Sequence, residues 1–167
     1  MIGQFLLAGA VNACGIAVVA FLLSRFVGEI YGRALLAIVL IVAGGTYVGF
    51  AVAGTTNGVW PLAETAQALV LGVVALLGLR GSPYWLAAAW AIHPLWDVLL
   101  HYFGAGRGFA PESWAISCVS FDLLIAAYLV VAHRFGPAGR TRGHSASHHD
   151  RHDGRRPTAA ARFLQAS

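Results

Sequence analysis

The stretch ALLAIVLIVAGGTYVGFAVAG, residues 34–54, runs for 21 residues without a charged side chain. At about 1.5 Å of rise per residue, a helix of this length covers roughly 30 Å, which is the thickness of the hydrocarbon core of a bilayer. Apolar helices of this length are typical of segments that span a membrane. The stretch therefore predicts an integral membrane protein built from helices.

The rest of the chain repeats this pattern. Of its 167 residues, 58% are hydrophobic and only 11% are charged, whereas an average soluble domain is about one-half apolar and about one-quarter charged. Connections rich in glycine, proline and polar residues separate the apolar runs and are expected to end the helices. The sequence predicts an all-α bundle of five transmembrane helices within residues 1–133, at about 5–24, 34–54, 62–79, 84–103 and 114–132.

The arginines predict how the bundle is oriented. All eleven basic residues are arginines, and ten of them fall on one side if the N-terminus lies outside, leaving only Arg107 on the other side. Basic residues accumulate in cytoplasmic connections. We therefore expect a multi-pass protein of the inner (plasma) membrane with an outside N-terminus and a cytoplasmic C-terminus.

Residues 134–167 form a separate basic tail without apolar periodicity, and we expect this tail to be disordered. Its arginines are suited to anionic lipid headgroups, so membrane lipids are the expected partners and nucleic acid is not. The tail also contains a histidine cluster that offers a second place for a metal ion. This cluster comprises His144, His148, His149 and His152.

Small residues recur every four positions in the first two predicted helices. Such stripes let helix backbones approach closely in lipid. They predict close packing inside the bundle or in a homo-oligomer, and the sequence leaves both open. The stripes are Gly9, Ala13 and Ala17 in the first helix, and Gly45, Gly49 and Ala53 in the second.

The stretch HPLWDVLLH, residues 93–101, places ionisable side chains in the fourth predicted helix. His93, Asp97 and His101 share one helix face, which must point into the bundle because ionisable groups are costly against lipid. The two histidines lie about 12 Å apart along a straight α-helix, too far to bind one ion. Judged by their depth in the membrane, His93 and Asp97 could contact Asp122 of the fifth predicted helix. Asp97 and His101 could contact Glu64 of the third. We expect a polar cavity that opens away from the cytoplasm.

The charges of these side chains need compensation. Glu64, Asp97 and Asp122 are carboxylates within predicted helices that contain no arginine. Buried carboxylates must take up protons, pair with protonated histidines or bind a cation. Three interpretations follow: a metal site, a path for protons or cations, and a structural hydrogen-bonded core.

Three short stretches of the sequence resemble a known family. HPLWDVLLH, followed by PES at 111–113 and CVSFD at 118–122, is similar to small bacterial and fungal integral membrane proteins catalogued as domain of unknown function six thousand and ten. The chain departs from the pattern at Leu100, where the family often has a second histidine. The resemblance supports the place of the site and implies no substrate. The motif positions correspond to His93, Trp96, Asp97, His101, Pro111, Ser113, Cys118 and Asp122.

We predict from the sequence a metal-dependent enzyme that acts on a lipid or lipid-soluble substrate. The expected ligands of a divalent ion, zinc or iron, are His93, Asp97, His101 and Asp122, and the expected catalytic carboxylates are Glu64 and Asp97. A small transporter coupled to protons or cations is the alternative, as is a purely structural bundle. No phosphate-binding loop, nucleophile elbow or HExxH motif is present to indicate another class of enzyme.

Overall fold

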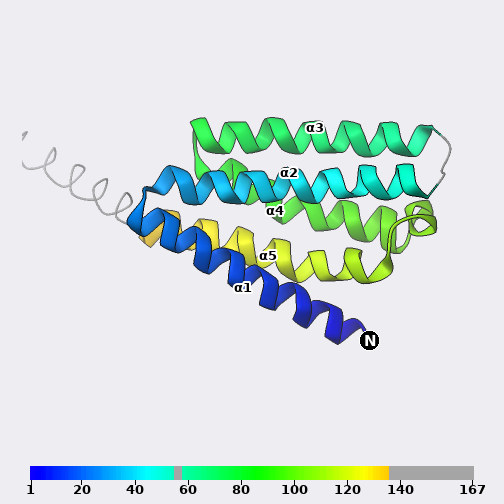
Figure 1. Cartoon of the computed structure of the whole chain (residues 1–167), viewed down its shortest axis with the longest axis horizontal. Helices are drawn as coiled ribbons and strands as arrows, with labels where there is room; N and C mark the ends of the chain where they lie inside the picture. Colours follow the sequence, from blue (N-terminus) through cyan, green and yellow to red (C-terminus); the bar gives the residue numbers. More distant parts are fainter. Residues whose placement is uncertain (55–57, 136–167) are drawn as a thin grey trace, which may run out of the picture. The chain divides into compact units, whose positions relative to one another are not determined.

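The computed structural model describes residues 1–54 and 58–135, and in this part of the chain the fold is all-α (Figure 1). Helix α4 continues without a break into the π-helix η1, and a 3-10 turn η2 precedes the last helix. The elements are α1 (Ile2–Phe26), α2 (Glu29–Ala53), α3 (Val59–Arg80), α4 (Pro83–Trp96), η1 (Asp97–Tyr102), η2 (Ala105–Gly108) and α5 (Glu112–Phe135).

Four of these helices, α1, α2, α3 and α5, are long and apolar enough to cross a membrane. The prediction of a helical membrane bundle is thus confirmed, with helix ends within a few residues of the expected ones. Helix α4 has only 14 residues, and the apolar run 84–103 is completed by η1. Five spans and their orientation remain proposals, to which we return below.

Local sequence explains how the helices begin and turn. Between α1 and α2 the chain reverses at Gly28, whose φ of 147° favours glycine because a side chain would be strained there. Helix α4 starts with Pro83, and the Ser82 hydroxyl accepts a hydrogen bond of 3.4 Å from the backbone N–H of Tyr84. These signals keep the connections short, so that consecutive helices pack side by side.

Outside the region of buried polar residues, apolar side chains from all five α-helices form the core. Helix α2 packs against α3 and α1, and α3 packs against α4. At Gly78 the backbone of α3 approaches α4 so closely that an added Cβ would lie 2.7 Å from the Cβ of Leu86. The largest buried apolar side chains are Leu36, Leu40, Leu86, Trp90 and Ile125.

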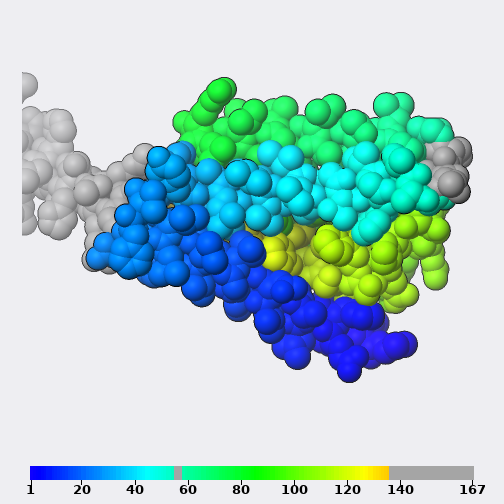
Figure 2. Space-filling view, in the orientation of Figure 1, coloured from blue at the N-terminus to red at the C-terminus, as the bar shows by residue number. Residues whose placement is uncertain are grey.

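Helix α1 runs obliquely to the others, and its N-terminal end stands away from α2 and α3 (Figures 1 and 2). It contacts α5 through Gly9, where an added Cβ would meet Ser117, and the Ser120 hydroxyl donates a hydrogen bond of 2.7 Å to the carbonyl oxygen of Leu6. The stripe that begins at Gly9 is therefore used inside the bundle. The stripe of α2 does not pack inside the bundle, because Cβ atoms at Gly45 and Gly49 would have no described neighbour within 4 Å.

These contacts belong to one compact unit, Met1–Val131, while α5 itself continues to Phe135. Residues 136–167 lie outside the described part of the chain. The predictions of a disordered tail and of a tail histidine cluster fall on these residues.

Candidate functional site

Five ionisable side chains are enclosed between α3, α4, η1 and α5. Their exposed fractions are 1% or less. The sequence led us to expect a polar cavity that opens away from the cytoplasm; the described structure does gather the polar groups in one region, but protein atoms enclose them. The five residues are Glu64, His93, Asp97, His101 and Asp122.

The inner group joins α4, η1 and α5. His93 Nδ1 lies 2.9 Å from Asp122 Oδ2, and His93 Nε2 lies 3.7 Å from Asp97 Oδ1. One candidate ligand atom from each of these three residues lies within 4.8 Å of the others. Imidazole nitrogens and carboxylate oxygens are the donors that bind zinc and similar divalent ions.

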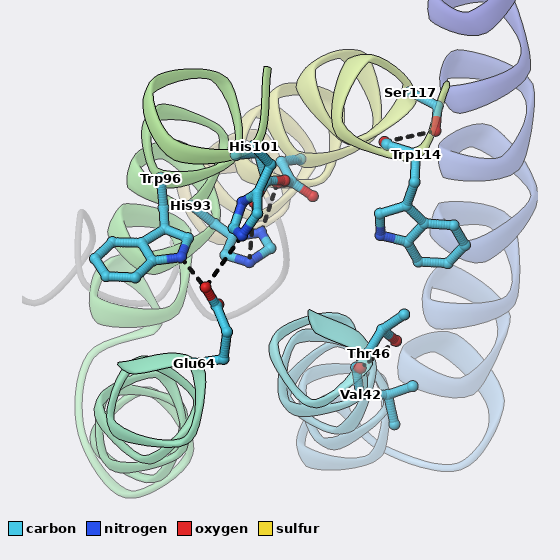
Figure 3. Close-up of polar contacts among 10 residues, drawn as sticks. Val42, Thr46, Glu64, His93, Trp96, His101, Trp114 and Ser117 are labelled. Atoms are coloured by element: carbon cyan, nitrogen blue, oxygen red, sulfur yellow. Dashed lines mark hydrogen bonds and ion pairs between the residues drawn. The ribbon is translucent and has the colours of Figure 1, made fainter. Parts of the chain in front are cut away.

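The outer group is centred on Glu64 of α3 (Figure 3). Its Oε1 lies 3.1 Å from His101 Nε2, and its Oε2 accepts a hydrogen bond of 3.2 Å from the indole N–H of Trp96. Both oxygens of this buried carboxylate are thus partnered. The pairing of Glu64 with His101, and of Asp122 with His93, agrees with the depths at which the sequence places them.

Tyr47 of α2 connects the two groups. Its ring stacks on His101 with a centroid distance of 4.1 Å and meets the edge of His93 at 6.2 Å. Its hydroxyl is close to the Asp97 carboxylate, as is the Cys118 thiol. Tyr47 was not among the site residues predicted from the sequence, although a tyrosine in the same half of an otherwise apolar predicted helix was a signal for it.

Several polar atoms of the site lack a hydrogen-bond partner among the described residues, although nearly all buried polar atoms in proteins have one. They are His93 Nε2, both oxygens of Asp97, Asp122 Oδ1, His101 Nδ1 and the Tyr47 hydroxyl. Most of them belong to the inner group or its immediate neighbour Tyr47. The inner group is thus rich in nitrogen and oxygen atoms that could bind a cation, whereas each Glu64 oxygen has a partner.

The π-helix η1 decides where His101 points. Pro94 lies inside α4 and has no backbone N–H to donate. From Asp97 onward the helix is a π-helix, in which hydrogen bonds join residues five apart. The N–H of Phe103, for example, donates to the carbonyl oxygen of Val98 at 3.0 Å. Four residues then cover less than one full turn. The α-helical spacing assumed from the sequence therefore does not apply between Asp97 and His101, and His101 turns toward Glu64.

The segment after η1 closes the outer group. At Gly106 an added Cβ would lie 2.6 Å from His101 Cδ2, so only glycine fits against the imidazole. The ring of Phe109 meets His101 edge-on at 5.6 Å and also contacts Trp60 at 5.2 Å. No feature of the sequence alone indicated that Gly106 lies against the site.

The structure thus divides the expected ligand set. It brings together His93, Asp97 and Asp122, and it pairs His101 with Glu64 instead. Arginine does not balance these charges in the described residues: Arg33, the one arginine there that is half-buried, lies 3.7 Å from Glu29 near the start of α2. Within residues 1–54 and 58–135, the basic side chains in contact with the three carboxylates are His93 and His101.

A family model covers residues 8–135, from α1 to the end of α5, and its description is family of unknown function (DUF6010). The chain belongs to this family. The match confirms the resemblance seen in the motifs of α4 and α5 and extends it over all five helices. No curated protein and no solved structure matches the chain. Membership of DUF6010 gives no activity, so the function must be argued from the site.

Proposed function

We propose that the protein is a membrane metalloenzyme that holds one divalent cation in the inner group of His93, Asp97 and Asp122. The observation that carries this proposal is Asp97. Its side chain is fully buried, and neither oxygen makes a hydrogen bond of regular geometry with a described residue, although the neutral Tyr47 hydroxyl and Cys118 thiol lie close to it. Leaving a buried carboxylate in this state costs several kcal/mol, on the order of 3 or more, unless a cation or a proton compensates it.

The charges favour a divalent cation over a proton. Glu64 already has partners for both oxygens, since His101 Nε2 lies 3.1 Å from Oε1 and the Trp96 indole donates to Oε2. The inner group then holds two carboxylates and one neutral imidazole, a net charge of minus two. A single divalent cation neutralises this group completely. A single proton would leave one buried negative charge.

The donor set suggests the metal and its chemistry. One imidazole with carboxylate oxygens suits zinc or iron(II) and leaves coordination positions for other groups. A bound ion of this kind polarises a substrate oxygen or activates water. Glu64, held by His101 and Trp96, is the residue that we propose as the acid or base. The helices around the site expose apolar side chains, so the substrate that we propose is a lipid or a lipid-soluble molecule.

Transport of protons or cations is the competing function. A transport path would need polar groups between the site and the opposite end of the bundle. The buried cluster in that half is apolar and includes Leu36, Leu40, Leu86 and Leu129. This observation favours the enzyme.

The metal proposal is tested by elemental analysis. The full chain is purified in detergent near neutral pH without chelators and without a histidine tag. We expect about one zinc or iron ion per chain, since a site that is built for a divalent ion retains it. Asp97→Asn should reduce the metal content at least about tenfold, while Glu29→Gln, at the far end of α2, should leave it unchanged.

A companion sample tests the alternative site in the tail. In it, His144, His148, His149 and His152 are replaced by alanine, and the metal content should equal that of the wild type. Metal lost with these histidines and retained in Asp97→Asn would place the ion in the tail. A wild type without metal, in which Asp97→Asn stops proton movement in vesicles, would instead support transport.

We also propose that η1 completes a fifth span and that the N-terminus lies outside. A single cysteine introduced as Ala105→Cys in a background of Cys14→Ser should react with an impermeant thiol reagent on sealed cells, whereas Ser82→Cys should react only after lysis. Both positions are exposed, and the native Cys118 is buried. Labelling of the Ser82 variant from outside would reverse the orientation.

A further inference from the structure

The two ring nitrogens of His93 have different surroundings. Nδ1 lies 2.9 Å from Asp122 Oδ2, which is a hydrogen-bonding distance, while Nε2 has no hydrogen-bond partner and lies 3.7 Å from Asp97 Oδ1. An ionised carboxylate only accepts hydrogen bonds, so the proton of the first contact belongs to Nδ1. In the neutral imidazole the lone pair is then on Nε2, which faces Asp97.

The second contact has the length expected across a metal ion. A distance of 3.7 Å is too long for a hydrogen bond. With bonds of about 2.1 Å from zinc to nitrogen and to oxygen, two ligands of a tetrahedral site lie about 3.4 Å apart. The separation of Nε2 from Asp97 Oδ1 is close to this value. The separation of Nδ1 from Asp122 Oδ2 is shorter and is that of a direct hydrogen bond.

We propose that Asp122 is a positioning residue, which fixes the tautomer and the ring orientation of His93, and that the ion lies between His93 Nε2 and Asp97. This inference rests on the proposed metal site and refines it. Histidines that bind metals commonly donate their other N–H to a carboxylate in this way. Here the carboxylate comes from α5 and the ligands come from α4 and η1, so the contact between these helices and the metal site depend on each other.

Tyr47 lies beside the proposed position of the ion. Tyr47 is fully buried, and its hydroxyl is close to Asp97. A water molecule or a substrate oxygen bound to the ion on this side would find the hydroxyl as a hydrogen-bond partner.

The test compares the two carboxylates with Co²⁺ as the probe, because its visible absorption reports the ligands around the ion. Asp97→Asn should abolish stoichiometric binding. Asp122→Asn should bind Co²⁺ with the wild-type spectrum and an affinity about tenfold lower, since the amide oxygen still accepts from Nδ1, and Asp122→Ala should lose about 100-fold. Rescue by the amide over alanine is the mark of a residue that acts through a hydrogen bond. Glu29→Gln is the control.

A measurement on the wild type does not depend on how the variants fold. With ¹⁵N-labelled histidine and bound ¹¹³Cd²⁺, we expect the cadmium to couple to Nε2 of His93 and a proton to remain on Nδ1. Cadmium coupling to Nδ1, or a Co²⁺ spectrum altered in Asp122→Asn, would make Asp122 a ligand and overturn the inference while leaving the metal site intact. A wild type that binds neither ion would instead refute the proposed function.

Discussion

Replacing Gly9 by leucine is expected to separate α1 from α5 and to lower the free energy of unfolding by about 3 kcal/mol. A Cβ at Gly9 would overlap the backbone carbonyl of Ser117, which cannot move without shifting α5. The hydrogen bond of 2.7 Å from Ser120 to the carbonyl oxygen of Leu6 would be lost in the same displacement. Both effects remove the contact that holds the N-terminal half of α1 against α5.

The matched control is Gly15→Leu on the same helix. A Cβ at Gly15 has open space in the described part of the chain, and the residue is exposed. Both variants add the same apolar side chain to α1, so they differ only in what that side chain meets. Reversible unfolding in mixed micelles measures the difference. Equal stability of the two variants would show that α1 and α5 are not packed through Gly9.

Replacing His101 by leucine should lower the free energy of unfolding by about 3 to 5 kcal/mol, the usual loss when one partner of a buried ion pair is removed. Glu64 would remain fully buried with only the indole of Trp96 as a partner. The stacked contact between the imidazole and Tyr47 would also change.

The double variant Glu64→Leu with His101→Leu separates these contributions. Because it removes the uncompensated charge as well, it should be more stable than His101→Leu alone, and the cycle should give a coupling energy of about 2 kcal/mol or more. If the losses of the two single variants simply added, Glu64 and His101 would not act as a buried pair. Leu99→Ala, at an exposed position of η1, serves as the control for changes in this segment.

The positions of the long apolar helices were predictable from the sequence because hydropathy marks the runs that are long enough to cross a membrane. The run at 34–54 corresponds to α2 at Glu29–Ala53, and the run at 114–132 lies inside α5 at Glu112–Phe135. The helices extend past several of the predicted ends because helical hydrogen bonding continues beyond the apolar residues. Which stripe of small residues packs inside the bundle was not predictable, since Gly9 and Gly45 look alike in sequence.

Which residues lie together in the candidate site was largely predictable from the sequence, but how they are arranged was predictable only in part. Carboxylates without arginine partners identified Glu64, Asp97 and Asp122, and depth paired them with the correct histidines. The enclosure of the site was missed because the residues that close it, Phe109 and Gly106, lie in a connection whose path depends on tertiary contacts. The hydropathy of the sequence does not indicate where this connection runs.

The widened turn of η1 sets a limit on how this constellation can be transferred to another protein. A designer who grafted HPLWDVLLH onto an ideal α-helix would keep every residue and every spacing. His101 would nevertheless point away from Glu64, because an α-helix has fewer residues per turn than the π-helix η1 and would rotate the side chain to another direction. Restoring the contact would require the irregular helix itself. The useful template is therefore the backbone from Pro94 to Phe103, including the hydrogen bond between residues five apart, and not the sequence motif alone.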